Sequence, residues 1–311
     1  MIIQDINAYT KKISFAKVRK AGIFFSDMET PLQWYNKQTD KPTLVCNCSL
    51  FSWSNLRRRY EPVFSLKINN QVIIQDSLFR GLGVSQGHFS IGDIQTLDCT
   101  DFVSGVPVIT ENGINKVTPA WLETLKDIAP ANPRTVFGWN DKECSVICVD
   151  GRQLGKFGID LASMPKLCLD NGLQNAVNFD GGGSSMTVVN GQVINSPCDT
   201  RGVYTVFAIW EDNMEWKAPN FNSISAKFAQ TDKNGNVKVQ NNTYEYAEMN
   251  AKAYGYAVWE KATQKRVYPK EVVQNVTETE KPAIVETNTG EKVFLESIKK
   301  MIDERLSNLN G

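Results

Sequence analysis

The stretch between residues 175 and 197, "NAVNFDGGGSSMTVVNGQVINSP", holds the densest set of side chains able to do chemistry. An apolar run ends on an aspartate, and three glycines and two serines follow. Successive N–H groups in a glycine-rich bend can converge on an anion, while hydroxyls and a carboxylate suit a polyol. The alternative is a tight strand-to-hairpin turn that binds nothing. The residues of the predicted phosphate and sugar site are Asp180, Gly181, Gly182, Gly183, Ser184 and Ser185.

Two more charged residues adjoin strand-like runs, Arg134 in "NPRTVFGW" and Asp150 in "VICVDGRQ". A guanidinium can bind a phosphate through two parallel hydrogen bonds, and an exposed strand arginine is the alternative. The glycine stretch lacks the lysine of a P-loop, and a strand pair follows it where a dinucleotide motif has a helix. Nucleotide binding is therefore the least favoured interpretation.

The elements around these residues resemble a strand–helix–strand crossover. Residues 144–149 and 175–179 are strand-like, and residues 160–172 predict a short helix with Ser163 as N-cap and Pro165 in the first turn. Such a connection normally joins parallel neighbours. We therefore expect Asp150 and Asp180 to lie near each other at the carboxyl edge of the sheet, where ligands bind in open α/β sheets.

The remaining pattern predicts an α+β fold with a large mixed β-sheet core and a few short helices. Two-residue turns between β-prone runs occur at residues 69–70, 112–113 and 190–191, and a weaker helix is expected over 118–129. Residues 1–215 form the predicted main domain. Residues 216–311 form a smaller attachment or oligomerisation module that ends in an amphipathic helix, Glu291 to Asn310, with apolar residues spaced by three and four. This helix is the predicted contact of a homo-oligomer.

Composition excludes several classes of protein. The chain has 311 residues, and 34 basic side chains balance 34 acidic ones, so no global charge attracts nucleic acid or a membrane. We expect neither a signal peptide nor a membrane span. Seven cysteines and a single histidine give no convincing zinc spacing, and reduced, buried thiols are the simpler interpretation. We predict no cofactor or metal; Asp150 with Asp180 is thin evidence for calcium.

These segments together resemble the phosphodiester glycosidase family. The resemblance rests on "NPRTVFGWNDKECSVICVDGRQ", on "GIDLASMPKLCLDNGLQNAVNFDGGGSSMTVVNGQVINSP" and on "VSGVPVITENG". It extends to "VCNCSLFSW", which keeps Asn47 and Phe51 but has Cys48 and Ser49 where the family usually has glycines. About residues 40–210 are covered.

The resemblance implies cleavage of the bond between the anomeric carbon of a sugar and a phosphodiester oxygen. The reaction is akin to glycoside hydrolysis through an oxocarbenium-like transition state. The leaving phosphate monoester, with a pKa of about 6, needs little protonation. Fixed donors must meet its growing charge, which is the role expected of Arg134 and the glycine N–H groups. Asp180 is the expected base, and Asp150 or Asp199 the second carboxylate.

The amide side chains nearby are expected to complete the site. We expect Asn47 to line one pocket with Asp180 and Arg134, and Asn178 and Asn195 to contact sugar hydroxyls or brace the loop. For Asn178 a structural role under the turn is equally expected.

The leading interpretation is thus a hydrolase acting on a sugar-1-phosphodiester. The biological setting inferred from the architecture is a phage tail or other virion protein, present in the virion or in the cytoplasm of the producing cell, that faces a teichoic-acid-like or other phosphosugar polymer of a cell wall. The alternative is a non-catalytic carbohydrate-binding or structural virion protein, which the departures at Cys48 and Ser49 favour.

Overall fold

Strands connected by tight turns and short helices build the chain. The computed structural model describes residues 7–268 apart from 77–78, 86, 213–217, 233–234 and 255–256. These described residues divide into two units between Glu211 and Asp212. The predicted terminal helix at Glu291 to Asn310 lies outside them.

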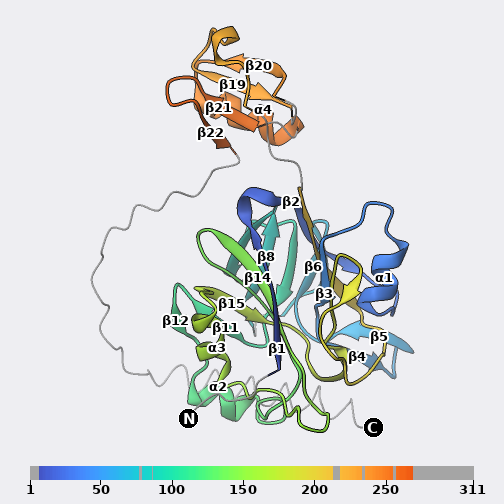
Figure 1. The fold of residues 1–311 in the computed structure, drawn as a ribbon. Helices are drawn as coiled ribbons and strands as arrows, with labels where there is room; N and C mark the ends of the chain where they lie inside the picture. Colours follow the sequence, from blue (N-terminus) through green and yellow to red (C-terminus); the bar gives the residue numbers. More distant parts are fainter. Residues whose placement is uncertain are drawn as a thin grey trace. The chain divides into compact units, whose positions relative to one another are not determined.

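The first unit contains three sheets and a separate hairpin among its described residues (Figure 1). The six-stranded sheet runs in the order β1 (Ala8–Ser14), β14 (Glu143–Val149), β13 (Arg134–Trp139), β15 (Asn175–Asn178), β11 (Val108–Glu111), β12 (Ile114–Asn115). One five-stranded sheet has the order β7 (Gln71–Ile74), β6 (Leu66–Ile68), β10 (Asp101–Ser104), β8 (Gly81–Ser85), β9 (His88–Gly92). The other has the order β17 (Gln192–Val193), β16 (Thr187–Val189), β3 (Leu44–Asn47), β18 (Thr205–Glu211), β2 (Val18–Phe25). The hairpin joins β4 (Phe51–Ser54) to β5 (Arg59–Pro62).

The central strands β13, β14 and β15 of the six-stranded sheet are buried on both faces, which their nearly continuous apolar residues explain. Along β13, Val136 joins the cluster under α2 (Pro119–Thr124) and α3 (Met164–Asp170), while Phe137 joins the cluster shared with the two five-stranded sheets. This alternation follows from the two-residue repeat of a strand. On the far face of the sheet that holds β3 and β18, Trp34 of α1 (Pro31–Lys37) packs over Val45.

The predicted fold class, α+β with a β-rich core and a few short helices, is confirmed. The turns at residues 69–70, 112–113 and 190–191 join neighbouring strands and have positive φ at both central residues, as expected of type I′ turns. Helix α3 begins after Ser163 and has Pro165 in its first turn, as predicted. The Ser163 side chain makes no capping hydrogen bond to the helix; the Asp160 carboxylate instead accepts from the Ser163 N–H (2.9 Å) and hydroxyl (3.1 Å).

The predicted crossover between parallel neighbours is wrong in one respect. Strands β14 and β15 run in the same direction, but β13 lies between them and pairs antiparallel with both. Every strand pair among the described residues is antiparallel, so the expected mixed sheet is not seen there. Asp150 and Asp180 still follow strands that end at the same edge of the sheet. Val149 is opposite Arg134 at the start of β13, and the Phe179 N–H donates to the carbonyl of Thr135, the next residue of β13.

The second unit, described from Asp212 to Tyr268 with the gaps given above, is a small antiparallel sheet with one α-helix. Its strands lie in the order β20 (Val237–Asn241), β19 (Phe228–Thr231), β21 (Ala257–Glu260), β22 (Lys265–Tyr268). Helix α4 (Tyr244–Tyr254) contributes Ala247 and Ala251, which pack against Val258.

Candidate functional site

The glycine turn carries the chain from one sheet into another. It leaves β15 of the six-stranded sheet, forms one 3₁₀ turn over Gly182–Ser184, and enters β16 of a five-stranded sheet. Asn47, at the end of β3, holds this passage in place. Its Nδ2 donates to the Asp180 carbonyl (2.6 Å), and its Oδ1 accepts from the Thr135 hydroxyl (2.8 Å) and the Met186 N–H (3.2 Å). Asn47 is fully buried and both polar atoms of its amide make hydrogen bonds, which is the arrangement expected of a residue that braces the loop.

The three glycines are needed because other groups lie against the backbone. A Cβ on Gly181 would come within 2.7 Å of the Pro133 carbonyl oxygen. Gly182 has φ of 58°, and a Cβ there would lie 3.1 Å from a guanidinium nitrogen of Arg152. At Gly183 the nearest atom would be a carboxylate oxygen of Asp199, at 2.9 Å. The Pro133 backbone leaves room only for glycine at 181 and the positive φ favours glycine at 182, whereas a side chain at 183 would have to displace that of Asp199.

The predicted nest of free amides is largely wrong. The Gly181 N–H donates to the Asp180 carboxylate (2.9 Å), and the Gly182 N–H to the Pro133 carbonyl (2.9 Å). The N–H groups of Ser184 and Ser185 close the 3₁₀ turn on carbonyls of the loop itself. A bend this tight satisfies its own donors, and a phosphate here would have to be met chiefly by side chains.

Asp180 has the environment of an acid–base group. It is 7% exposed, and burial raises the pKa of its carboxyl from about 3.8 to about 6. The Ser184 hydroxyl, the charge of Arg201, the Gly181 N–H and the charge of Arg152 oppose this rise, in decreasing order. The guanidinium of Arg201 in turn donates to the Ser184 hydroxyl oxygen (2.8 and 3.3 Å). A carboxyl that titrates near neutral pH is suited to proton transfer.

Arg134 does not contact the glycine turn through its charged nitrogens, contrary to the prediction. Its side chain is buried, and the guanidinium donates to the carbonyls of Ile159 (3.2 Å), Pro130 (2.8 Å) and Ile128. Burial lowers the pKa of Arg134 to about 10, which the charge of Asp160 partly opposes. The arginine ties the chain before β13 to the chain before α3, because its guanidinium donates to carbonyls of both segments.

Replacing Arg134 with methionine should destabilise the protein by about 1–2 kcal/mol, because the carbonyls of Ile128, Pro130 and Ile159 would each lose a hydrogen bond from the guanidinium. Urea unfolding followed by circular dichroism measures the change. Arg19→Met, which breaks an exposed ion pair with Asp40, is the matched control and should leave the midpoint nearly unchanged. A stable Arg134 variant with defective substrate binding would instead restore the predicted phosphate role.

Asp150 is also occupied structurally. Its side chain is fully buried, its Oδ2 accepts from Lys156 (2.7 Å), and its Oδ1 accepts from the Ser196 N–H (2.7 Å). Asn195 donates to the same carboxylate at 3.4 Å and to the Ser185 carbonyl at 3.1 Å, while its Oδ1 accepts from the Thr187 N–H. Asp150 and Asn195 therefore fix the hairpin after the glycine turn, and neither has the open geometry expected of a catalytic or substrate-binding group.

Asn178 takes the structural role that was one of its two expected roles. It is buried at the end of β15 and donates to the Val106 carbonyl (2.5 Å). Its Oδ1 and the hydroxyl of Ser185 are buried without a hydrogen-bond partner among the described residues. The Ser185 hydroxyl, directly after the glycine turn, therefore makes no hydrogen bond that stabilises the described fold.

Two arginines lie where the prediction placed Arg134. Arg152 and Arg201 are both exposed. Arg152 lies against Gly182, and Arg201 lies against Gly183 together with Asp199. Arg152 has φ of 56°, a strained conformation of the kind that concentrates at functional sites, and its Nε donates to the Asn132 side chain (2.9 Å). The "DGR" turn was a usable signal for Arg152. Arg201 has no local motif, since only folding brings it to Ser184.

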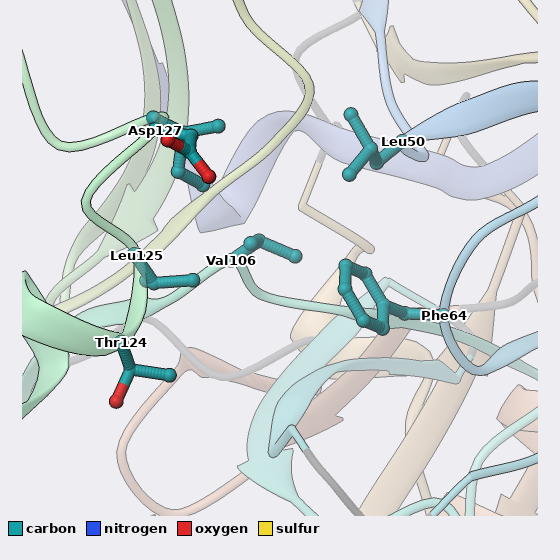
Figure 2. Close-up of a pocket in the computed structure, with 7 residues that line it drawn as sticks. Leu50, Phe64, Val106, Thr124, Leu125 and Asp127 are labelled. Carbon is teal, nitrogen blue, oxygen red and sulfur yellow. The ribbon is translucent and has the colours of Figure 1, made fainter. Parts of the chain in front are cut away.

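The cavity shown in Figure 2 is not lined by the glycine turn, Arg152 or Arg201. It measures about 20 Å³, room for roughly one water molecule, and Leu50, Phe64 and Leu125 are among its lining residues. None of the predicted site residues lines it. Within the described ranges, no three acidic, histidine or cysteine side chains gather as metal ligands would. No helix in that part of the chain has the length and apolarity needed to cross a membrane.

Comparison with curated proteins finds two relatives over limited segments. The SPbeta prophage-derived uncharacterized protein YomE of Bacillus subtilis (strain 168) is 37% identical over 99 residues, which are 32% of this chain and 15% of that protein. The N-acetylglucosamine-1-phosphodiester alpha-N-acetylglucosaminidase of Bos taurus is 32% identical over 128 residues, which are 38% of this chain and 22% of that protein. The chain therefore spans less than a quarter of either relative.

Solved structures share the fold at low identity. The zebrafish N-acetylglucosamine-1-phosphodiester alpha-N-acetylglucosaminidase catalytic domain, auto-inhibited by its pro-peptide, matches with a TM-score of 0.52 and 16% identity, over 67% of this chain and 83% of that one. A hypothetical protein from Synechocystis matches with a TM-score of 0.55 and 9% identity, over 67% and 59% of the two chains. The family profile described as phosphodiester glycosidase matches residues 53–210, which include the glycine turn, Arg152 and Arg201. The chain belongs to the phosphodiester glycosidase family.

Proposed function

We propose that this protein hydrolyses the bond between a sugar's anomeric carbon and the oxygen of a phosphodiester. The observation that carries the proposal is Asp180, a carboxyl with a pKa near 6 beside a glycine turn on which Arg152 and Arg201 lie. A base and two cations at one turn match the two needs of the reaction, an activated water and a stabilised phosphate.

In the proposed reaction Asp180 removes a proton from water, and the water oxygen forms the new bond to the anomeric carbon. The electron pair of the broken C–O bond leaves with the phosphate monoester, whose charge Arg152 and Arg201 meet. The monoester needs no general acid, because its conjugate acid is already strong, with a pKa of about 6. Asp199 is the second carboxylate of the proposed site, in place of Asp150.

The direct test is hydrolysis of UDP-N-acetylglucosamine in ¹⁸O-labelled water. The proposal requires N-acetylglucosamine and UDP as products, with the label in the sugar and none in the UDP phosphate. Label in the phosphate would mean attack at phosphorus and would overturn the assignment of the broken bond. Binding without any turnover would favour the alternative, a non-catalytic carbohydrate-binding protein. The observation in favour of this alternative is that only 7% of Asp180 is exposed to solvent.

The activity should depend on pH through Asp180. Because the base must be unprotonated and burial raises its pKa to about 6, we expect kcat/KM to fall about tenfold for each pH unit below 6 and to level off above 7. Initial rates on UDP-N-acetylglucosamine between pH 4 and pH 8 check this. An acid limb near pH 4 would mean that an ordinary exposed carboxylate is the base.

The setting we propose is a phage or prophage protein. The prophage-derived relative of Bacillus subtilis supports it, with 37% identity over 99 residues. A role in the virion, and attachment or oligomerisation through residues 216–311, remain part of the proposal. Mass spectrometry of purified virions from a producing strain tests the first, and light scattering of the full chain tests the second.

A further inference from the structure

The β4–β5 hairpin presents a row of aromatic rings to solvent. In its register Trp53 is opposite Tyr60, and Phe51 lies two residues before Trp53 on the same face of the strand. The ring centroids of Trp53 and Tyr60 are 5.1 Å apart, and those of Tyr60 and Phe51 are 5.6 Å apart. Trp53 is 45% exposed and Tyr60 is 41% exposed. Large rings held in contact yet exposed are typical of a ligand-binding surface.

The turn of this hairpin adds positive charge. Arg57, Arg58 and Arg59 are consecutive and exposed, and Arg58 has φ of 50°. Glu61 is the only acidic residue between residues 51 and 62, and it accepts from Arg57 (2.9 Å) and Arg59 (2.8 Å). The hairpin therefore has two more positive than negative charges, although the chain as a whole is neutral.

The aromatic row is continuous with the candidate site. The guanidinium of Arg201 lies 5.8 Å from the ring centroid of Phe51, and the same guanidinium donates to Ser184 in the glycine turn. A cation held over a ring is attracted by its π face, so the two groups support each other's position. Arg201 is thus followed by three rings, Phe51, Tyr60 and Trp53, in a row that leads from the glycine turn along the hairpin.

We propose that the β4–β5 hairpin binds a polymer of sugars joined through phosphodiesters and leads it to the glycine turn. Sugar rings stack on Trp53 and Tyr60, while the phosphates between them pair with the arginines of the hairpin turn. This inference rests on the proposed function and deepens it, because it makes the substrate a polymer and not a small sugar phosphodiester. Exposed rings with arginines can also bind single-stranded nucleic acid. The glycan is favoured because the row ends at a site suited to a sugar and a phosphate.

The test compares a polymer with a small substrate, using the full-length protein. Binding of a poly(N-acetylglucosamine 1-phosphate) wall polymer is measured by calorimetry at two salt concentrations, and hydrolysis of UDP-N-acetylglucosamine is measured alongside. We expect Trp53→Ala to weaken polymer binding about tenfold or more, while kcat/KM on UDP-N-acetylglucosamine stays within about twofold. Arg58→Gln should reduce the dependence of binding on salt.

Controls separate a lost contact from a damaged hairpin. Leu56→Ala removes an apolar side chain that is 93% exposed in the same hairpin turn and should change nothing, and Trp53→Phe should restore most of the binding. Equal polymer binding by wild type and Trp53→Ala would overturn the inference, as would tighter Trp53-dependent binding of an oligo-deoxythymidine. Trp53-dependent polymer binding without any hydrolysis would support the hairpin's role while contradicting the proposed function.

Discussion

Asp180→Asn should lower kcat on a sugar-1-phosphodiester by about 10³-fold or more, because an amide cannot take a proton from the attacking water. The amide keeps the size of the side chain, and its oxygen can still accept from the Gly181 N–H, so the turn should keep its shape. Single-turnover release of UDP from UDP-N-acetylglucosamine measures the loss. The acid limb near pH 6 should disappear from whatever residual rate remains.

The same substitution should stabilise the fold. The pKa of Asp180 is raised in the folded protein, so between about pH 4 and pH 6 the folded state binds a proton more tightly than the unfolded chain. The contribution of Asp180 to stability is therefore fully present below about pH 4 and is lost as the pH rises through 6. At pH 7 the neutral asparagine should gain about 1–3 kcal/mol in urea unfolding, an upper range because the amide also loses charged hydrogen bonds.

Matched variants decide whether the loss is specific. Asp170→Asn removes an exposed carboxylate paired with Lys166 and should leave turnover unchanged. Asp199→Asn tests the competing base beside Gly183. Full loss in Asp199→Asn with substantial activity in Asp180→Asn would exchange the two roles, and undiminished activity in both would contradict the proposed site.

Arg201→Gln should lower kcat/KM on UDP-N-acetylglucosamine by about 10²- to 10³-fold, the range seen when one donor to a developing anion is removed. On an aryl N-acetylglucosaminide, whose leaving group has no phosphate, the loss should be less than about tenfold. Parallel kinetics on the two substrates give the ratio. Equal losses on both would mean that Arg201 acts through the shape of the turn and not on phosphate.

A second readout follows from the charge of Arg201. This charge lowers the pKa of Asp180, so its removal should move the acid limb of the pH profile to higher pH. Arg201→Lys keeps the charge and should restore the limb while recovering only part of the rate, because lysine lacks the two-pronged donor. Arg19→Gln is the surface control.

Local sequence determined the elements and the turn that matter here. The two-residue turns with positive φ, the start of α3 after Ser163, and the β-rich α+β fold all followed from propensity and spacing. The sequence also predicted a crowded backbone at residues 181–183, because three consecutive glycines indicate that another group lies close to the backbone there. It also places Asp180 at the end of a strand next to the glycines, and the structure gives it the burial and raised pKa of an acid–base group.

Tertiary structure decided which groups lie close to those glycines. Arg134, Asp150 and Asn47 are polar residues at the expected sheet edge, but their polar atoms are bound within the fold. Arg134 donates to backbone carbonyls, Asp150 accepts from a lysine, and Asn47 donates to the backbone of the turn. Arg201 comes from a segment 21 residues beyond Asp180 and reaches Ser184 only once β18 has paired. Sequence spacing places side chains at an edge, whereas the direction of a long polar side chain depends on which partners the finished fold leaves unsatisfied there.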